Sequence, residues 1–258
     1  MWTRQLLKEN GRIAFLRNYW TCVIVSALAS VLASGSIGIN LGYNANTEVE
    51  DGAVEELLAL WKQVPYEIII TIFVGIIIGA LFALLFSVFC GNVILVGRNR
   101  YFMENREHKT EIACLFYGFQ GARYKKTVKV MFVKDIFVFI ATLFFVIPGI
   151  IMSYQYMLVP YIAAENVHMD RKRMFALSKQ MMEGHKMEAF ELDFSFIGWY
   201  LLGGVSGGLV NVFYTAPYVC ATFTEFYTAL KSEALQKGIL MPNELPGVIE
   251  PEVEIPIV

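Results

Sequence analysis

The sequence predicts an all-α protein, a polytopic membrane bundle of about six transmembrane helices arranged as three hairpins. Of the 258 residues, 56% are hydrophobic and 17% are charged, which is more apolar surface than a soluble domain of this length can bury. All but one of the 21 Lys and Arg residues fall in four segments, at 1–18, 97–134, 165–187 and 231–258. Apolar stretches separate these segments, and membrane insertion keeps Lys and Arg on the cytoplasmic side. Both termini are therefore expected in the cytoplasm.

The chain opens with a basic amphipathic helix at 1–18, which is expected to lie in the membrane interface. The six-helix domain should then occupy residues 19–232. Its first span is expected at 19–39, and an acidic outer loop follows at 40–65. The second span, 66–96, is longer than the roughly 20 residues that cross a hydrocarbon core. This helix must therefore tilt or project into the cytoplasm.

The next apolar stretch has basic segments on both sides, so it must cross the membrane twice or dip in and return. We predict a hairpin with legs at 133–147 and 150–164, because Pro148 and Gly149 favour a break between the legs. A re-entrant loop is the alternative.

A second clearly amphipathic basic helix at 170–187 leads to the last hairpin, with legs at 189–202 and 209–230. The tail at 233–258 carries Pro residues among Glu residues and is predicted to be disordered. Each of the three hairpins follows a basic amphipathic segment. Internal repeats of this kind are common in transport proteins.

Small residues recur at every fourth position of the second span, and the set is Gly75, Gly79, Ala83, Ser87 and Gly91. This spacing places them on one helix face, where small side chains let helices approach closely in lipid. The face is therefore predicted to be a helix-packing surface. Its partner is either the rest of the bundle or, alternatively, a second copy of the chain or another membrane protein.

Ionisable residues gather at the start of the fifth span, where His185, Glu188 and Glu191 are spaced by threes and Asp193 lies deepest. Such a group could bind a cation or relay protons, since ionisable side chains at membrane depth are costly. Alternatively, these residues cap the span in the wet interface and pair with neighbouring Lys residues. Aromatic residues nearby fit a stacking wall or an interfacial belt. The full set of candidate ligand-binding residues is His185, Glu188, Glu191, Asp193, Tyr154, Tyr161, Trp199, Tyr218 and Glu225.

The HExxH, Walker and protein-kinase motifs do not occur in the sequence, and no catalytic residue and no cofactor are predicted. The four cysteines form no CxxC or Cys/His cluster, and no metal site is predicted. The basic segments flank apolar spans and are expected to contact lipid phosphates, not nucleic acid.

Several stretches resemble the domain-of-unknown-function 975 family of polytopic bacterial membrane proteins, over roughly residues 1–232. The stretches are Leu115–Phe119, Ile147–Tyr154, Val159–Asn166, Ala176–Lys179, Met182–Lys186 and Leu192–Trp199. The resemblance implies a bundle of about six helices in the bacterial cytoplasmic membrane, and it implies no activity or site residues. The family is more distantly similar to membrane domains attached to some glycerophosphodiester phosphodiesterases, which points by analogy to lipid handling.

Together these observations predict an integral membrane protein that binds or transports a small amphipathic or lipid-like ligand, or that serves as an accessory subunit of a transport system. A scaffold or immunity-type interaction protein is the alternative, and an intramembrane enzyme that uses His185 with Glu188 or Asp193 is a second one. The expected partners are membrane lipids, and another membrane protein or a second copy of the chain would serve the alternative.

Overall fold

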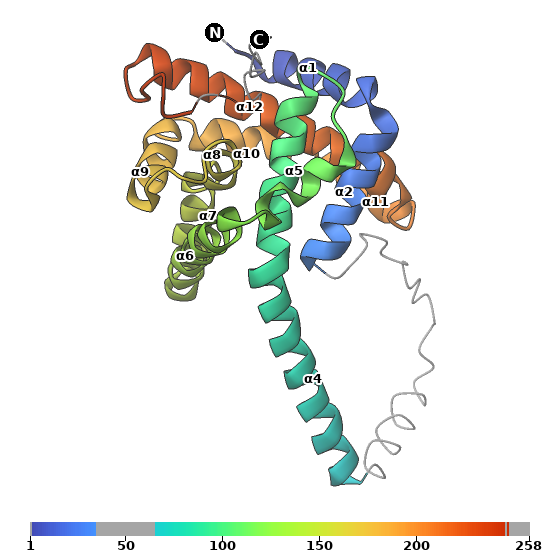
Figure 1. Cartoon of the computed structure of the whole chain (residues 1–258). Helices are drawn as coiled ribbons and strands as arrows, with labels where there is room; N and C mark the ends of the chain where they lie inside the picture. The colour runs from blue at the N-terminus through green and yellow to red at the C-terminus, as the bar shows by residue number, and fades with distance from the viewer. Residues whose placement is uncertain (1, 35–64, 246, 248–258) are drawn as a thin grey trace, which may run out of the picture.

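The computed structural model describes residues 2–34, 65–245 and 247. These residues form helices and helical turns with no β-strand among them, so the all-α class is confirmed. Figure 1 shows a body of packed helices from which one long helix projects. The expected outer loop, apart from Pro65, and the tail from 248 onward lie outside the described residues.

The projecting helix is α4 (Tyr66–Phe86), which continues through the π-helical turn η1 (Ser87–Gly91) into α5 (Asn92–Asn105). Within the described part of the chain no residue of α4 is buried, whereas most residues of α5 lie in the core of the body (Figure 1). The helix therefore runs on beyond residue 96, the predicted end of the second span. Its second half is stabilised by packing against protein, which hydropathy alone does not register.

The end of the body opposite to α4 is built by α1 (Arg4–Arg17), which lies along α12 (Ala216–Gln236) (Figure 1). Thr3 caps α1 by accepting a hydrogen bond from the amide of Leu6 at 3.3 Å. The two helices approach closely at Gly11, where the glycine leaves room for the other backbone. A Cβ atom at this position would lie 2.8 Å from the backbone of Thr222. After α1 the chain bends by 100° into α2 (Tyr19–Ser34).

The middle of the chain forms a hairpin beside α5. The 3₁₀ helix η2 (Ile112–Phe119) packs on α5, and α6 (Ala122–Phe144) is followed by α7 (Val146–Gln155) and α8 (Val159–Glu165). The break between α6 and α7 falls at Phe145, which adopts an extended backbone, so the predicted break at Pro148–Gly149 is wrong. Pro148 instead lies in the first turn of α7, where no helical partner for its missing N–H is needed.

The last part of the body consists of α9 (Arg171–Met181), α10 (Lys186–Phe194), α11 (Ile197–Val205), the π-helical turn η3 (Asn211–Thr215) and α12. The expected leg at 189–202 is interrupted after Phe194. The expected leg at 209–230 begins in η3 and continues to Gln236.

The chain after α12 folds back onto α9, and the predicted disorder at 233–258 is wrong for its first part. Leu240 and Leu245 are buried, and the guanidinium of Arg173 binds both carboxylate oxygens of Glu244 at 2.7 and 2.8 Å. Asn166 adds a hydrogen bond to the backbone oxygen of Glu244 at 2.9 Å. Burial of two leucines and a two-point ion pair order a segment whose composition indicates disorder.

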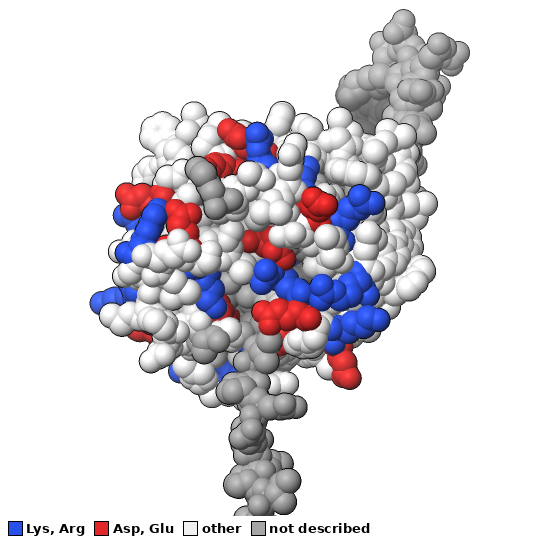
Figure 2. Space-filling view, turned by 90° about the horizontal axis from the view of Figure 1, so that it is seen from above, with Lys and Arg blue, Asp and Glu red and all other residues white. Residues whose placement is uncertain are grey.

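Two helices in the described residues are long and apolar enough to cross a membrane, Tyr66–Asn105 and Val146–Glu165. The bent pair Arg4–Arg17 and Tyr19–Ala33 adds a third if it counts as one span. Large exposed apolar side chains gather on α4, on the α6–α7 turn and on α11; examples are Phe73, Phe82, Phe144, Phe145, Ile147, Leu201 and Val205. Figure 2, seen from the end opposite to α4, shows charged side chains spread over that face.

Candidate functional site

A cavity of about 930 Å³ lies between α5, α6, α7, α8, α10 and α12. Most of its wall is apolar or aromatic, with Leu95, Val138, Phe139, Ile150, Met157, Phe190, Val219 and Phe223 among the lining residues. Its charged lining residues come from three helices, and they are Arg98, Lys134, Asp135 and Asp193. Apolar walls with a few converging polar groups are typical of sites for small amphipathic ligands.

Arg98 is placed in the wall by α5. The Nε atom of Arg98 is buried and has no hydrogen-bond partner. No other described residue forms a hydrogen bond or an ion pair with the Arg98 guanidinium. A buried donor without a partner is costly, so an acceptor supplied by a ligand would relieve that cost.

The neighbouring charges on α6 compensate one another. Lys134 Nζ lies 3.1 Å from Asp135 Oδ1, and Asp135 Oδ2 accepts a hydrogen bond from the Asn92 side chain at 2.7 Å. The amide of Asn92 thus ties α5 to α6 beside the cavity. This pair adds polarity to the wall without adding net charge.

Asp193 faces the cavity from α10, and its Oδ2 atom accepts a hydrogen bond from the Tyr154 hydroxyl at 3.2 Å. Tyr161, on α8, lines the cavity too, and its ring stacks on Tyr227 with 5.1 Å between centroids. The structure therefore brings together three of the predicted ligand-binding residues, Tyr154, Tyr161 and Asp193.

His185 lies outside the cavity. Its Nδ1 atom is 2.6 Å from Glu188 Oε2, and its Nε2 atom is 3.2 Å from Glu233 Oε1. The ring of His185 also packs near Trp2 at 5.9 Å between centroids. An imidazole can donate to both carboxylates only when both ring nitrogens carry protons. These contacts fasten the start of α10 to α12 and the N-terminal segment.

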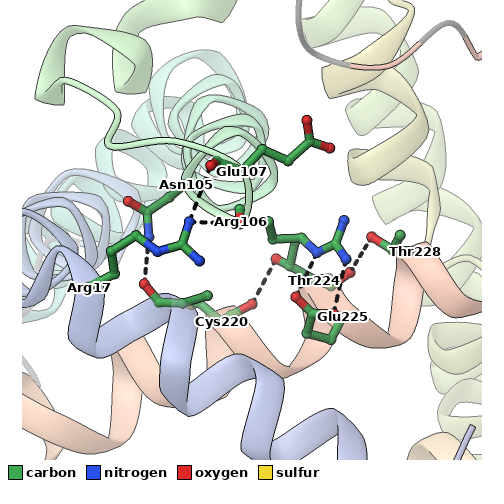
Figure 3. Close-up of polar contacts among 9 residues, drawn as sticks. Arg17, Asn105, Arg106, Glu107, Cys220, Thr224, Glu225 and Thr228 are labelled. Atoms are coloured by element: carbon green, nitrogen blue, oxygen red, sulfur yellow. Dashed lines mark hydrogen bonds and ion pairs between the residues drawn. The ribbon is translucent and has the colours of Figure 1, made fainter.

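Glu225 is also engaged elsewhere, as Figure 3 shows. The guanidinium of Arg106 binds its two carboxylate oxygens at 2.6 and 3.1 Å. In the same region Arg17 donates to the backbone oxygens of Arg106 at 2.9 Å and Glu107 at 3.2 Å (Figure 3). Glu225 thus belongs to a network that joins α1, the end of α5 and α12.

The remaining predicted site residues are likewise away from the cavity. Glu191 pairs with Arg4 at 3.2 Å on the surface. Trp199 packs on Tyr214 with 4.6 Å between ring centroids, and Tyr218 packs edge-on against Phe196 at 5.2 Å. Within the described ranges no group of three His, Cys, Asp or Glu side chains is placed to hold a metal ion.

The small-residue face of the second span has two different environments. A Cβ atom at Gly91 would lie 2.7 Å from the backbone oxygen of Ala33, so this end packs closely on α2. At Gly75 and Gly79 nothing among the described residues lies within 4 Å of such an atom. The end of the face at Gly91 therefore packs within the chain. A partner for the end of the face at Gly75 and Gly79 stays a prediction.

Sequence reasoning missed Arg98, Lys134 and Asp135. The two cations were grouped with the basic cytoplasmic segment, and Asp135 was not singled out. An acidic residue directly before the apolar run from Ile136 was the available signal for a polar group inside the bundle.

The model of one protein family, described as a protein of unknown function (DUF975), matches residues 5–234. The match confirms the family resemblance. No curated protein and no solved structure matches the chain.

Proposed function

The chain belongs to the DUF975 family of proteins of unknown function, and we propose that it binds an amphipathic, lipid-like molecule in the cavity beside Arg98 and Asp193. The observation that carries this proposal is the buried Nε atom of Arg98, which lacks a hydrogen-bond partner among the described residues. The volume of about 930 Å³ lies near the upper end of the range of about 300–1,000 Å³ that holds small ligands.

The proposal includes a location in the bacterial cytoplasmic membrane, with six membrane-inserted segments and both termini in the cytoplasm. Two or three described helices have the length and composition of a span. The exposed apolar side chains of α4, α7 and α11 would meet lipid, and the charged face of Figure 2 would meet cytoplasm and lipid phosphates. The shorter helices would enter the membrane as hairpins, and packing against neighbouring helices would cover the backbone polar groups at their ends.

The chemistry of the cavity selects a ligand with two kinds of group. Arg98 would bind an anionic oxygen of the head group, such as a phosphate, because a guanidinium donates several hydrogen bonds in one plane. The Oδ2 atom of Asp193 accepts the hydrogen bond from the Tyr154 hydroxyl. Its Oδ1 atom would accept a hydrogen bond from an amine or hydroxyl of the ligand. The apolar wall would hold the hydrocarbon part.

The test replaces Arg98 by Gln in the full chain, which is then extracted from its own membrane in nanodiscs. Native mass spectrometry of the wild type should show a reproducible small-molecule or lipid adduct, and Arg98→Gln should lose it. Arg98→Lys should keep a fraction of the adduct, since the positive charge remains but the planar set of guanidinium donors is lost.

Arg12→Gln is the matched control, because Arg12 is exposed on α1 and forms no side-chain ion pair with another described residue. It should retain the adduct. An adduct that persists in Arg98→Gln, or bulk lipids alone in every variant, would contradict the proposed cavity site.

A second function, docking of another membrane protein or a second copy, is favoured by one observation. Gly75 and Gly79 have no neighbour within 4 Å among the described residues, on a helix without a buried residue. Gly79→Ile should then remove the partner and leave the monomer folded, whereas Ile77→Phe, which adds bulk to the other side of α4, should not. Complex mass in nanodiscs measures both, and equal loss in the two variants would argue against this face.

A further inference from the structure

A second hollow, of about 410 Å³, lies on another side of the body. Leu85 and Phe89 at the end of the projecting helix form one wall, and Val128 and Phe132 of α6 form the other. Lys125 and Lys129 of α6 also line the hollow, and the remaining lining residues are Leu84, Val88 and Tyr124. The hollow shares no residue with the cavity of Arg98, so it is a separate site.

The two lysines are one helical turn apart on α6 and point to the same side of the helix. Both are exposed, and neither forms a hydrogen bond or an ion pair with any other described residue. The lining contains no Asp or Glu. The groove therefore combines an apolar floor with two positive charges that nothing in the described chain neutralises.

We propose that this groove between α4 and α6 binds an anionic phospholipid, with an acyl chain against Leu85, Phe89 and Val128 and the phosphate on Lys125 and Lys129. Charge complementarity favours a head group with net negative charge, because a zwitterionic one would place its cation beside two ammonium groups without a carboxylate partner. A free phosphate ion would leave the apolar floor unused.

The place of the groove in the fold agrees with this occupant. Lys125 and Lys129 lie near the start of α6, at the side of the charged segments, whereas α6 ends among exposed phenylalanines. Lysine side chains at such a boundary lie along apolar surface and keep the ammonium group at the lipid phosphates. The lipid would also bridge the projecting α4 to the body.

The experiment uses the full chain in phosphatidylcholine nanodiscs titrated with phosphatidylglycerol, and native mass spectrometry counts the retained lipids. Each lysine near an anionic lipid surface contributes about a fivefold factor, so Lys125→Gln with Lys129→Gln should weaken retention of phosphatidylglycerol roughly 25-fold. Lys125→Arg with Lys129→Arg should keep it. Val128→Phe, which narrows the groove and leaves both charges, should weaken retention as well.

The matched control is Lys172→Gln with Lys179→Gln, which removes two exposed lysines of α9 that lie outside the groove. Retention within twofold of the wild type is expected for this control. Equal retention of phosphatidylglycerol and phosphatidylcholine by the wild type would overturn the proposal. So would an equal loss in the α9 control, which would mark a general effect of surface charge, or full retention after both groove lysines are replaced.

Discussion

Arg106 and Glu225 form a two-point ion pair, with 2.6 Å between Nε and Oε1 and 3.1 Å between Nη2 and Oε2. The Glu225 side chain is 8% exposed and that of Arg106 is 27% exposed. The pair joins the residue that follows α5 to the middle of α12. Glu225, which its sequence position suggests as a ligand-binding residue, is thus paired with a residue at the end of another helix.

Glu225→Ala should lower the free energy of unfolding by about 2 kcal/mol. Breaking a buried pair costs about 3–5 kcal/mol, and the partial exposure of Arg106 reduces that penalty. Arg106→Ala combined with Glu225→Ala should cost less than the sum of the single changes. Urea unfolding in detergent micelles measures these effects. Glu9→Ala, on the exposed side of α1, is the control and should change stability by less than about 0.5 kcal/mol.

Two glycines of the same long helix should respond differently to alanine. A Cβ atom at Gly97 would lie 1.9 Å from the backbone oxygen of Leu115, which η2 holds against α5. Gly97→Ala should therefore destabilise the fold by about 3 kcal/mol. Gly79→Ala meets nothing within 4 Å in the described chain and should change stability by less than about 1 kcal/mol. Equal unfolding midpoints for the two variants would contradict the close packing of η2 on α5.

The contact between Arg173 and Glu244 predicts a pH dependence for the segment after α12. Hydrogen bonding from Arg173 lowers the pKa of Glu244 from 4.5 to about 2. A carboxylate with a lowered pKa stabilises the docked segment fully above about pH 4.5 and loses that effect as the pH falls through about 2. Fluorine NMR of a label on Met241→Cys, which is 66% exposed in the wild type, should show release in this range. With Glu244→Gln added, the label should be as mobile above pH 4.5 as it is in the acidified protein that keeps Glu244.

The sequence predicted the helical class, because its long apolar runs and segregated charges are typical of apolar helices. The family was predicted from the resemblance of particular stretches, such as Ile147–Tyr154, and the family match confirms it. It placed the start of the long helix correctly at Tyr66. It did not place the break at Phe145, since a proline is compatible with the first turn of a helix and marks a boundary only to within a few residues.

The candidate site was predicted only in part, for a physical reason. Spacing by threes gathers His185, Glu188 and Glu191 on one helix face but says nothing of partners from other helices. Arg106 precedes Glu225 by 119 positions, and Arg4 precedes Glu191 by a longer stretch still. Conversely, Arg98 and Asp193 line the same cavity only because α5, α6 and α10 pack around it.

Asp193 gives the sharpest test of the ligand chemistry. Asp193→Asn preserves the shape of the side chain and its hydrogen bond from Tyr154, but it removes the negative charge. A hydrogen bond that involves a charged group contributes about 1.5–3 kcal/mol, so affinity for the adduct of the wild type should fall roughly 10- to 100-fold. The measurement is the fraction of protein that retains the adduct in nanodiscs.

Glu191→Gln is the matched control for that measurement, because Glu191 lies on the same helix and pairs with Arg4 outside the cavity. It should leave retention unchanged, as should Trp199→Phe, whose side chain packs on Tyr214. If Asp193→Asn retains the adduct while Arg98→Gln loses it, the ligand carries an anionic group without a donor for Asp193. If Glu191→Gln loses the adduct as completely as Asp193→Asn, the loss does not depend on a contact inside the cavity, and the proposed role of Asp193 is contradicted.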